Sequence, residues 1–385
     1  MNKIIQITSE ILLIPVLFLI ALFNRYNKKY DVGIGPEPLI NNVYHKMALE
    51  KNGYKVITFV AKSYYITSKF DIDLSKTHSI DTLIGKLIIF LKLYSVSLKS
   101  KILYIYFNGG PIGLYTKLLW RIEPFFLSLA RVKTLLLPYG GDVQDLKFMN
   151  NLNFKHSTIS DYPEHRNRRR KISKKIDLWC VKADHIICGC DWVDTIFYWD
   201  TLLLSHFSIN TNKVNLKNYE ISENKIFRVL HAPNHKTIKG TKQLVKAVNN
   251  INKEKKRIEL VLVEKKSNKQ ILDLIESVDL VADQFVIGWY AMFAIEAMSL
   301  SKPVLCYLRD DLLNLYQFAS IIDSGDIPII NTPLNSIEKK LMFCLNNKKE
   351  LKEIGERSRK FVEKFHSLEY IGDIFDKINR DLLNN

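Results

Sequence analysis

The 385-residue chain has only five cysteines, and their spacing matches no zinc-binding motif. Cys188 and Cys190 alternate along an apolar run, so they would share one face of a strand. We expect buried free thiols in a reducing compartment, with a redox or metal-binding pair as the alternative. Hydrophobic residues make up 47% of the chain, which excludes a disordered protein and leaves room for two domains.

Acidic residues are the scarcer charged class, because 40 Asp and Glu stand against 56 Lys and Arg, a net charge of +16. This balance favours negatively charged partners such as nucleotides, phosphorylated lipids, an anionic membrane face or nucleic acid. The most basic run, Asp161–Lys175, has no aromatic residue after Tyr162, so a base-stacking platform is not indicated. We expect no nucleic-acid partner. The run is either a solvated helix face or a surface for anionic lipid or phosphate.

Charge is absent from Ile11–Phe23, which lies in an apolar segment, Ile4–Phe23. That segment is about long enough for a membrane span of roughly 20 residues. It has no small-residue cleavage site, which disfavours a signal peptide. More basic residues follow the segment than precede it, so the positive-inside rule keeps the protein body in the cytoplasm. We expect residues 1–29 to form an apolar helix: a single span or interfacial anchor at the cytoplasmic face of the inner membrane, or a buried helix of the first domain.

The first strand lacks the third glycine of a dinucleotide-binding fingerprint. Gly33 and Gly35 occupy the first two glycine places, but Pro38 occupies the third. Two glycines after a strand indicate a close backbone approach, with or without a ligand. Gly35 is therefore a candidate binding residue.

Strands alternate with helices in both halves of the chain, which predicts an α/β fold with two parallel sheets. We expect strands at residues 30–35, 55–60, 102–107, 134–138, 185–190, 227–231, 258–263, 283–287, 304–307 and 327–331. We expect helices at 39–51, 81–100, 114–130, 161–184, from 191, and at 242–251, 289–300, 334–345, 350–365 and 368–383. The polar stretch 214–225 reads as the connection between the halves, giving domains at 30–222 and 223–365, followed by a terminal helix at 366–385.

One candidate site residue of the first half is Asp142, which follows the strand at 134–138. In an open parallel sheet, ligands bind beyond the carboxyl ends of the strands. Gly140 and Gly141 would allow a close approach, so Asp142 could hold a sugar hydroxyl or a protonated group. An ordinary turn with Asp at a helix start is the alternative.

The second half offers a candidate anion site and a lone acid. Lys236 and Lys239 lie in the loop after the strand at 227–231, ahead of a helix, where ammonium groups and free backbone N–H groups suit a diphosphate. A lysine-rich surface turn is the alternative. Glu296 lies in the middle of an apolar helix, where a carboxylate is costly unless it is paired. It either belongs to a local network or faces a cleft.

The stretches HAPNHKTIKGTKQLVKAV, which begins at His231, and DQFVIGWYAMFAIEAMSLSKPVLCYLR, which begins at Asp283, resemble the second domain of the group 1 glycosyltransferases. That family has the GT-B fold, with two Rossmann-like domains facing a cleft. The resemblance implies that Lys236 and Lys239 bind the donor diphosphate and that Glu296 binds the donor ribose. It also implies retention at the anomeric carbon and no required metal or cofactor. In this reading Asn234, Gly240 and Gly288 join the donor site, and residues 140–142 resemble a cleft loop of the first domain.

The chain departs from the family pattern at Gly288, where many members have the first Glu of an E-x7-E motif. Tyr290 and Ala291 stand where many members have Phe-Gly. No histidine of the first half matches a catalytic histidine of the family. These departures concern the contacts to the donor sugar.

Together these features lead us to expect a hexosyltransferase that uses a UDP- or GDP-sugar donor. Lys236, Lys239 and Asp142 are its candidate catalytic residues. The basic surface and the apolar N-terminus indicate an anionic membrane surface and a lipid-linked saccharide acceptor, as in bacterial surface-polysaccharide (lipopolysaccharide O-antigen) assembly. The alternatives are a nucleotide-sugar epimerase with the same two-domain frame and an inactive membrane-associated nucleotide-sugar-binding subunit.

Overall fold

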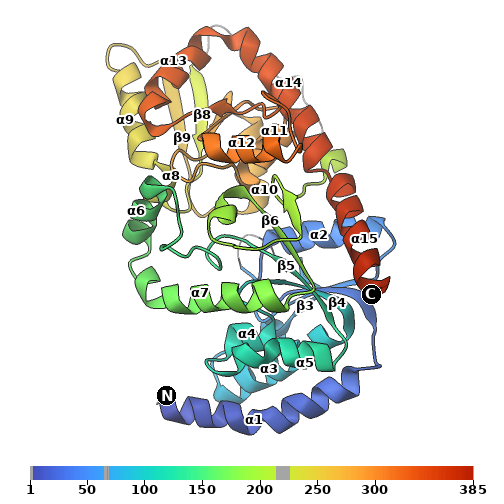
Figure 1. The fold of residues 1–385 in the computed structure, drawn as a ribbon. Helices are drawn as coiled ribbons and strands as arrows, with labels where there is room; N and C mark the ends of the chain where they lie inside the picture. Colours follow the sequence, from blue (N-terminus) through green and yellow to red (C-terminus); the bar gives the residue numbers. More distant parts are fainter. Residues whose placement is uncertain (1–2, 65–66, 68, 214–225, 385) are drawn as a thin grey trace.

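The computed structural model describes residues 3–64, 67, 69–213 and 226–384, with side chains described from residue 7 onward. The connection expected at 214–225, and with it the predicted domain boundary, lies outside the described residues. The described chain forms two parallel sheets, one in each half, with helices packed around them (Figure 1).

The first sheet has seven strands in the order β3-β2-β1-β4-β5-β6-β7. Its strands are β1 (Tyr30–Ile34), β2 (Val56–Val60), β3 (Ile72–Asp73), β4 (Ser100–Tyr106), β5 (Lys133–Leu137), β6 (His185–Gly189) and β7 (Thr201–Leu203). Its helices are α1 (Lys3–Asn24), α2 (Ile40–Lys51), α3 (Leu83–Leu98), α4 (Pro111–Tyr115), α5 (Glu123–Leu129), α6 (Leu152–Asp161) and α7 (His165–Lys182). The central strands are buried and rich in Ile, Leu and Tyr, as parallel strands covered on both faces require.

The second sheet has five strands in the order β12-β11-β10-β8-β9. Its strands are β8 (Phe227–His231), β9 (Ile258–Leu262), β10 (Leu280–Ala282), β11 (Val304–Cys306) and β12 (Ile330–Asn331). Its helices are α8 (Lys236–Lys239), α9 (Thr241–Ile251), α10 (Asn268–Glu276), α11 (Met292–Ser299), α12 (Asp310–Phe318), α13 (Ile337–Asn346), α14 (Lys348–Phe365) and α15 (Leu368–Asn384).

The last helix returns to the first half of the chain. In Figure 1, α14 and α15 run from the second sheet down beside the first. Helix α15 packs against α2. The hydroxyl of Tyr104 on β4 donates to Asn379 Oδ1 at 2.9 Å, and the hydroxyl of Tyr54 donates to Asp376 Oδ1 at 2.8 Å. This helix therefore ties the end of the chain to the first sheet.

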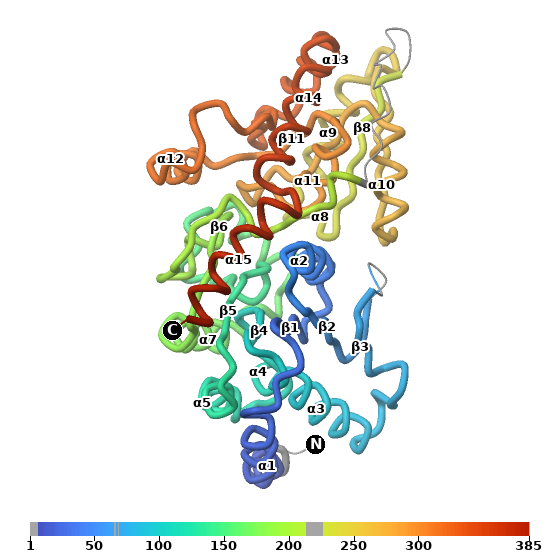
Figure 2. The backbone as a smooth tube through the Cα atoms, turned by 90° about the vertical axis from the view of Figure 1, so that its right-hand side faces the viewer, coloured from blue at the N-terminus to red at the C-terminus, as the bar shows by residue number. Residues whose placement is uncertain are grey.

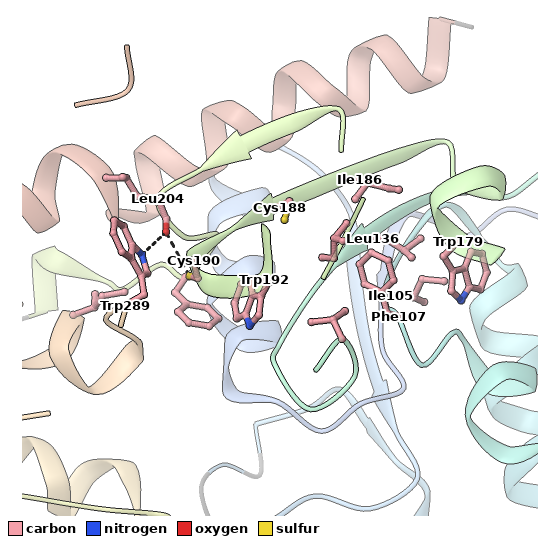
Figure 3. Packing of buried hydrophobic residues seen from close by; sticks show 14 of the residues in the cluster. Ile105, Phe107, Leu136, Trp179, Ile186, Cys188, Cys190, Trp192, Leu204 and Trp289 are labelled. Carbon is pink, nitrogen blue, oxygen red and sulfur yellow. Dashed lines mark hydrogen bonds between the residues drawn. The ribbon is translucent and has the colours of Figure 1, made fainter. Parts of the chain in front are cut away.

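Apolar packing is continuous from the first sheet into the second half. In Figure 3, Trp289 lies beside Cys190 and Leu204, and its indole N–H donates to the Leu204 carbonyl at 2.9 Å. Cys188 and Cys190 are buried free thiols, as expected, and burial raises the pKa of each. The two halves thus share part of one core.

Three local predictions were wrong, and β3, α6 and β7 are among the elements that were not predicted. The strand expected at 283–287 is instead β10 at Leu280–Ala282, and the chain from Asp283 onward forms the loop that meets the first half. The helix expected at 114–130 is divided into α4, a 3-10 turn and α5. The helix expected from 191 is a single 3-10 turn, Cys190–Asp194. At 283–287 the apolar run is buried against residues of the first half instead of in the sheet.

Candidate functional site

A pocket opens at the carboxyl ends of β8 and β9, where loops of the second half meet α10 and α11. Its walls include Ala232, Pro233, Asn234 and Lys239 after β8, residues 263–266 after β9, Asn268 and Ile271 of α10, Met292, Phe293 and Glu296 of α11, and Ile40. Ile40 begins α2, so the first half also contributes to the wall. This is the edge of a parallel sheet at which ligands bind.

Lys239, at the end of α8, brings a positive charge to this pocket. Its ammonium lies 2.6 Å from Oδ1 of Asp283, which directly follows β10 and is almost fully buried. Oδ2 of Asp283 has no hydrogen-bond partner among the described residues. The buried carboxylate therefore fixes the position of Lys239, and the ammonium keeps further N–H donors for a ligand.

Glu296 brings a buried carboxylate to the same pocket. Its side chain is 4% exposed, and Asn268 Nδ2 of α10 donates to its Oε1. Burial, together with the smaller effect of the Asp283 charge, raises the pKa of Glu296 to about 7, against the hydrogen bond from Asn268, which lowers it. The sequence left open a local network or a cleft, and the structure shows both. One amide partner leaves most of the acceptor capacity of the carboxylate for a ligand.

The remaining candidates of the second half surround this pair at different depths. Asn234 lines the pocket. Lys236 is exposed and does not line the pocket. Its ammonium lies 2.7 Å from the carboxylate of Glu264, which does line the pocket. Gly240 has φ +73°, and a Cβ there would lie 3.1 Å from Phe285 Cβ. It ends α8 where another residue would be strained.

Gly288 does not line this pocket, and a side chain in place of Gly288 would collide with Arg309. Its φ is +93°, and a Cβ would lie 2.4 Å from Arg309 Cγ. The Arg309 guanidinium makes two contacts, of 2.7 and 3.0 Å, with the carboxylate of Asp194 in the first half. It also pairs with Asp311. An ion pair between the two halves therefore lies beside Gly288.

The first-half candidates Gly140, Gly141 and Asp142 form a loop apart from the pocket. Asp142 is fully buried, and its carboxylate accepts N–H groups from Tyr139, Gly140 and Phe107 at 3.0 to 3.1 Å. Burial raises its pKa to about 7. The Asp142 carboxylate thus connects the loop after β4 to the loop after β5, and its contacts fix the position of residues 139–142.

Gly35 follows β1, and a Cβ there would lie 2.2 Å from the Phe59 carbonyl oxygen. The expected close backbone approach is present, and its partner is the neighbouring strand β2. A few residues later the chain reaches Ile40 in the pocket wall.

Asn268 and Asp283, which orient Glu296 and Lys239, were not predicted as site residues. A polar cluster at the carboxyl end of β4 was not predicted either. There Asn108 Nδ2 donates to Glu37 Oε1 at 2.7 Å, and Lys175 Nζ donates to the Asn108 carbonyl at 2.6 Å. Burial lowers the pKa of Lys175 to about 8 and raises that of Glu37. The Asn-Gly-Gly-Pro turn after β4 was the signal available in the sequence.

The two halves also meet at the loop that carries the lysines. Asp161 at the end of α6 accepts the N–H of Ile238 at 3.0 Å, and Tyr162 hydrogen-bonds His235. Asn151 at the start of α6 donates to the Val286 carbonyl at 2.7 Å. Helix α6 therefore links the first half to both loops beside Lys239. Among the described residues, no three His, Cys, Asp or Glu side chains come together as a metal site.

Comparison with solved structures places this arrangement in a known fold. The chain matches the Anabaena HepE structure in complex with UDP-glucose at TM-score 0.58 and 11% identity, over 91% of this chain and 99% of that one. It matches sucrose-phosphate synthase from Thermosynechococcus elongatus at TM-score 0.59 and 13% identity, over 92% and 98%. No family model and no curated sequence matches the chain. With two parallel sheets of seven and five strands and an apolar N-terminal helix, the protein has the GT-B fold.

Proposed function

We propose that the protein is a glycosyltransferase that moves a hexose from a UDP- or GDP-sugar to a lipid-linked saccharide. The observation that carries the proposal is that Lys239 and Glu296 both line one pocket at the carboxyl edge of the second sheet. A cation and a buried carboxylate are complementary to the two polar parts of a nucleoside diphosphate, the phosphates and the ribose hydroxyls. The GT-B fold and the structural match to a protein bound to UDP-glucose support this choice of ligand.

Lys239 would stabilise the departing nucleoside diphosphate as negative charge builds on the leaving oxygen. Its ion pair with buried Asp283 holds the ammonium in place before the donor binds, which lowers the cost of organising the site. Lys236 would add positive charge at the pocket rim. Glu296 would accept hydrogen bonds from the ribose hydroxyls and so orient the donor.

The first half would bind the acceptor and close over the donor. Ile40 already contributes to the pocket wall, and α6 already contacts the Lys239 loop. Asp142 would act indirectly, by holding the loops after β4 and β5 in place. Closure would exclude water, so that the sugar passes to the acceptor hydroxyl. Retention of configuration and independence of metal ions are part of the proposal, as the family resemblance implies.

We further propose surface-polysaccharide assembly at the cytoplasmic face of the inner membrane as the setting. The test is turnover: the purified chain is incubated with a panel of UDP- and GDP-sugars and a lipid extract, and the labelled lipid product is analysed by mass spectrometry. Transfer from one donor, lost in Lys239→Ala, supports the proposal. Interconversion of the donor sugar without acceptor would instead identify an epimerase, and binding without turnover an inactive subunit.

A further inference from the structure

We propose that α1, together with the start of α3 and with α5, forms one apolar surface that lies in the plane of an anionic lipid bilayer. We name it the bilayer-facing surface and define it by Leu12, Leu19, Phe23, Leu83, Ile84 and Phe125, each more than half exposed. Figures 1 and 2 both place α1 at the end of the molecule farthest from the second sheet. The proposal does not depend on the transferase assignment.

Helix α1 is apolar on its outward face as well as on its inward face. The residues from Ile11 to Asn24 include no charged side chain. Its inward stripe, Leu17 and Ala21, is fully buried, whereas Leu12 is 72% and Phe23 73% exposed. An outer helix of a soluble protein carries polar residues on its outward face. An apolar outward face of this length therefore requires a cover.

The contacts of α1 favour a position in the membrane plane over a span. Buried Glu10 accepts the backbone N–H groups of Lys117 and Leu118 at 2.8 and 2.7 Å. The Tyr94 hydroxyl of α3 donates to the Leu17 carbonyl at 3.2 Å. A spanning α1 would break these bonds, uncover Leu17 and carry the Glu10 carboxylate toward the hydrocarbon core, where charged groups are costly.

Neighbouring elements extend the surface on both sides of α1. Figure 2 shows α3 on one side of α1 and α5 on the other, and α1 packs against both. Leu83 and Ile84 in the first turn of α3 are 70% and 72% exposed, and Phe125 of α5 is 56% exposed. Three elements distant in sequence therefore present apolar side chains at the same end of the molecule.

Basic residues surround this surface, which identifies its partner as an anionic bilayer. Exposed Lys117 is bonded through its backbone N–H to Glu10 of α1, Arg121 is exposed in the turn before α5, and Lys86 is exposed on α3. Beyond the end of α1, the Arg131 guanidinium lies 4.9 Å from the centre of the Tyr26 ring. Lysine and arginine beside an apolar face bind anionic headgroups. A second copy of this chain fits less well, because symmetric pairing would bring two basic rims together.

The experiment is flotation of the full-length protein with vesicles. Phosphatidylcholine vesicles containing about a third phosphatidylglycerol should bind the wild type, with binding weakened by salt. Leu12→Glu with Leu19→Glu should lower partitioning by about a hundredfold, since a buried leucine side chain contributes about a factor of ten or more. The matched control is Phe318→Glu, because Phe318 is 92% exposed on α12 of the second half. That variant should bind as the wild type does.

Thermal melting and thiol labelling test the proposal further. Because both leucines are exposed, the double variant should keep its melting temperature, so lost binding cannot be attributed to unfolding. A protein with Lys3→Cys and with its own half-exposed Cys180 replaced by serine should react with an impermeant maleimide when bound to sealed vesicles, whereas a span would carry the new thiol into the lumen. Equal binding of the wild type and the double variant, a protected thiol, or a wild-type dimer that the double substitution dissociates would each overturn the proposal.

Discussion

Replacing Glu296 by glutamine should stabilise the ligand-free protein while weakening donor binding. Burial raises the pKa of Glu296 to about 7. The folded state therefore holds the proton more tightly than the unfolded chain does, and its stability falls as pH rises between about pH 4.5 and 7. At about 1.4 kcal/mol per pKa unit, the ionised carboxylate lowers the free energy of unfolding by about 3 kcal/mol above pH 7. A neutral amide of the same shape removes that penalty.

Urea unfolding from pH 5 to 8 measures this effect as the difference between Glu296→Gln and the wild type. The difference should be small at pH 5 and rise to about 3 kcal/mol at pH 8. Glu356→Gln, on the exposed face of α14, is the matched control and should show no such rise. Parallel curves for the wild type and Glu296→Gln would refute the reasoning.

Donor binding by the same proteins tests the function of the carboxylate. Hydrogen bonds to a charged acceptor contribute about 1.5 to 3 kcal/mol, so Glu296→Gln should bind nucleotide about ten- to a hundredfold more weakly at pH 8. Wild-type affinity should fall by up to about tenfold per pH unit below pH 7, because in the proposed site the ionised carboxylate would accept both ribose hydroxyls. Isothermal titration with UDP and GDP measures both effects, and unchanged affinity in the variant would exclude Glu296 from the site.

Two other ion pairs carry predictions. Lys239→Ala should abolish transfer and, by leaving Asp283 buried without its cation, lower the free energy of unfolding by about 3 kcal/mol; adding Asp283→Asn should restore stability in urea unfolding but not turnover, and restored turnover would contradict the assigned role. Asp194→Asn removes the buried partner of Arg309 and should cost about 3 kcal/mol in urea unfolding. The control Asp311→Asn removes an exposed partner of the same guanidinium and should lower the free energy of unfolding by less than about 1 kcal/mol. Equal losses in the two variants would contradict a larger stabilisation by the buried Arg309–Asp194 pair.

The five central strands of the first sheet (β1, β2, β4, β5 and β6) and β8 and β9 could be predicted to within about two residues, because each is a short apolar run bounded by turn residues. The short strands β3 and β7 at the sheet's edges were not predicted. The apolar run from Phe285 onward has the same composition but forms no strand. Val286 packs instead with Met149 and Phe154 of the first half and with Ile238. Sequence periodicity does not distinguish burial in a sheet from burial between halves.

The site could be predicted in part. Glu296 was predicted as a site residue because a carboxylate in an apolar helix is costly unless it is paired. Lys239 was predicted because lysine is unfavourable just before a helix N-terminus. The sequence could not show that Asp283, 44 residues from Lys239, would be its partner. Nor could it show that Asp142 directs its carboxylate to backbone N–H groups, since a turn aspartate and a ligand-binding aspartate look alike in a single sequence.

A structure of the chain with a bound nucleoside diphosphate tests the central claim most directly. We predict the ribose hydroxyls within hydrogen-bond distance of Glu296 and the diphosphate against the Lys239 ammonium. A nucleotide bound elsewhere, or one bound in this pocket with its ribose away from Glu296, would contradict the account.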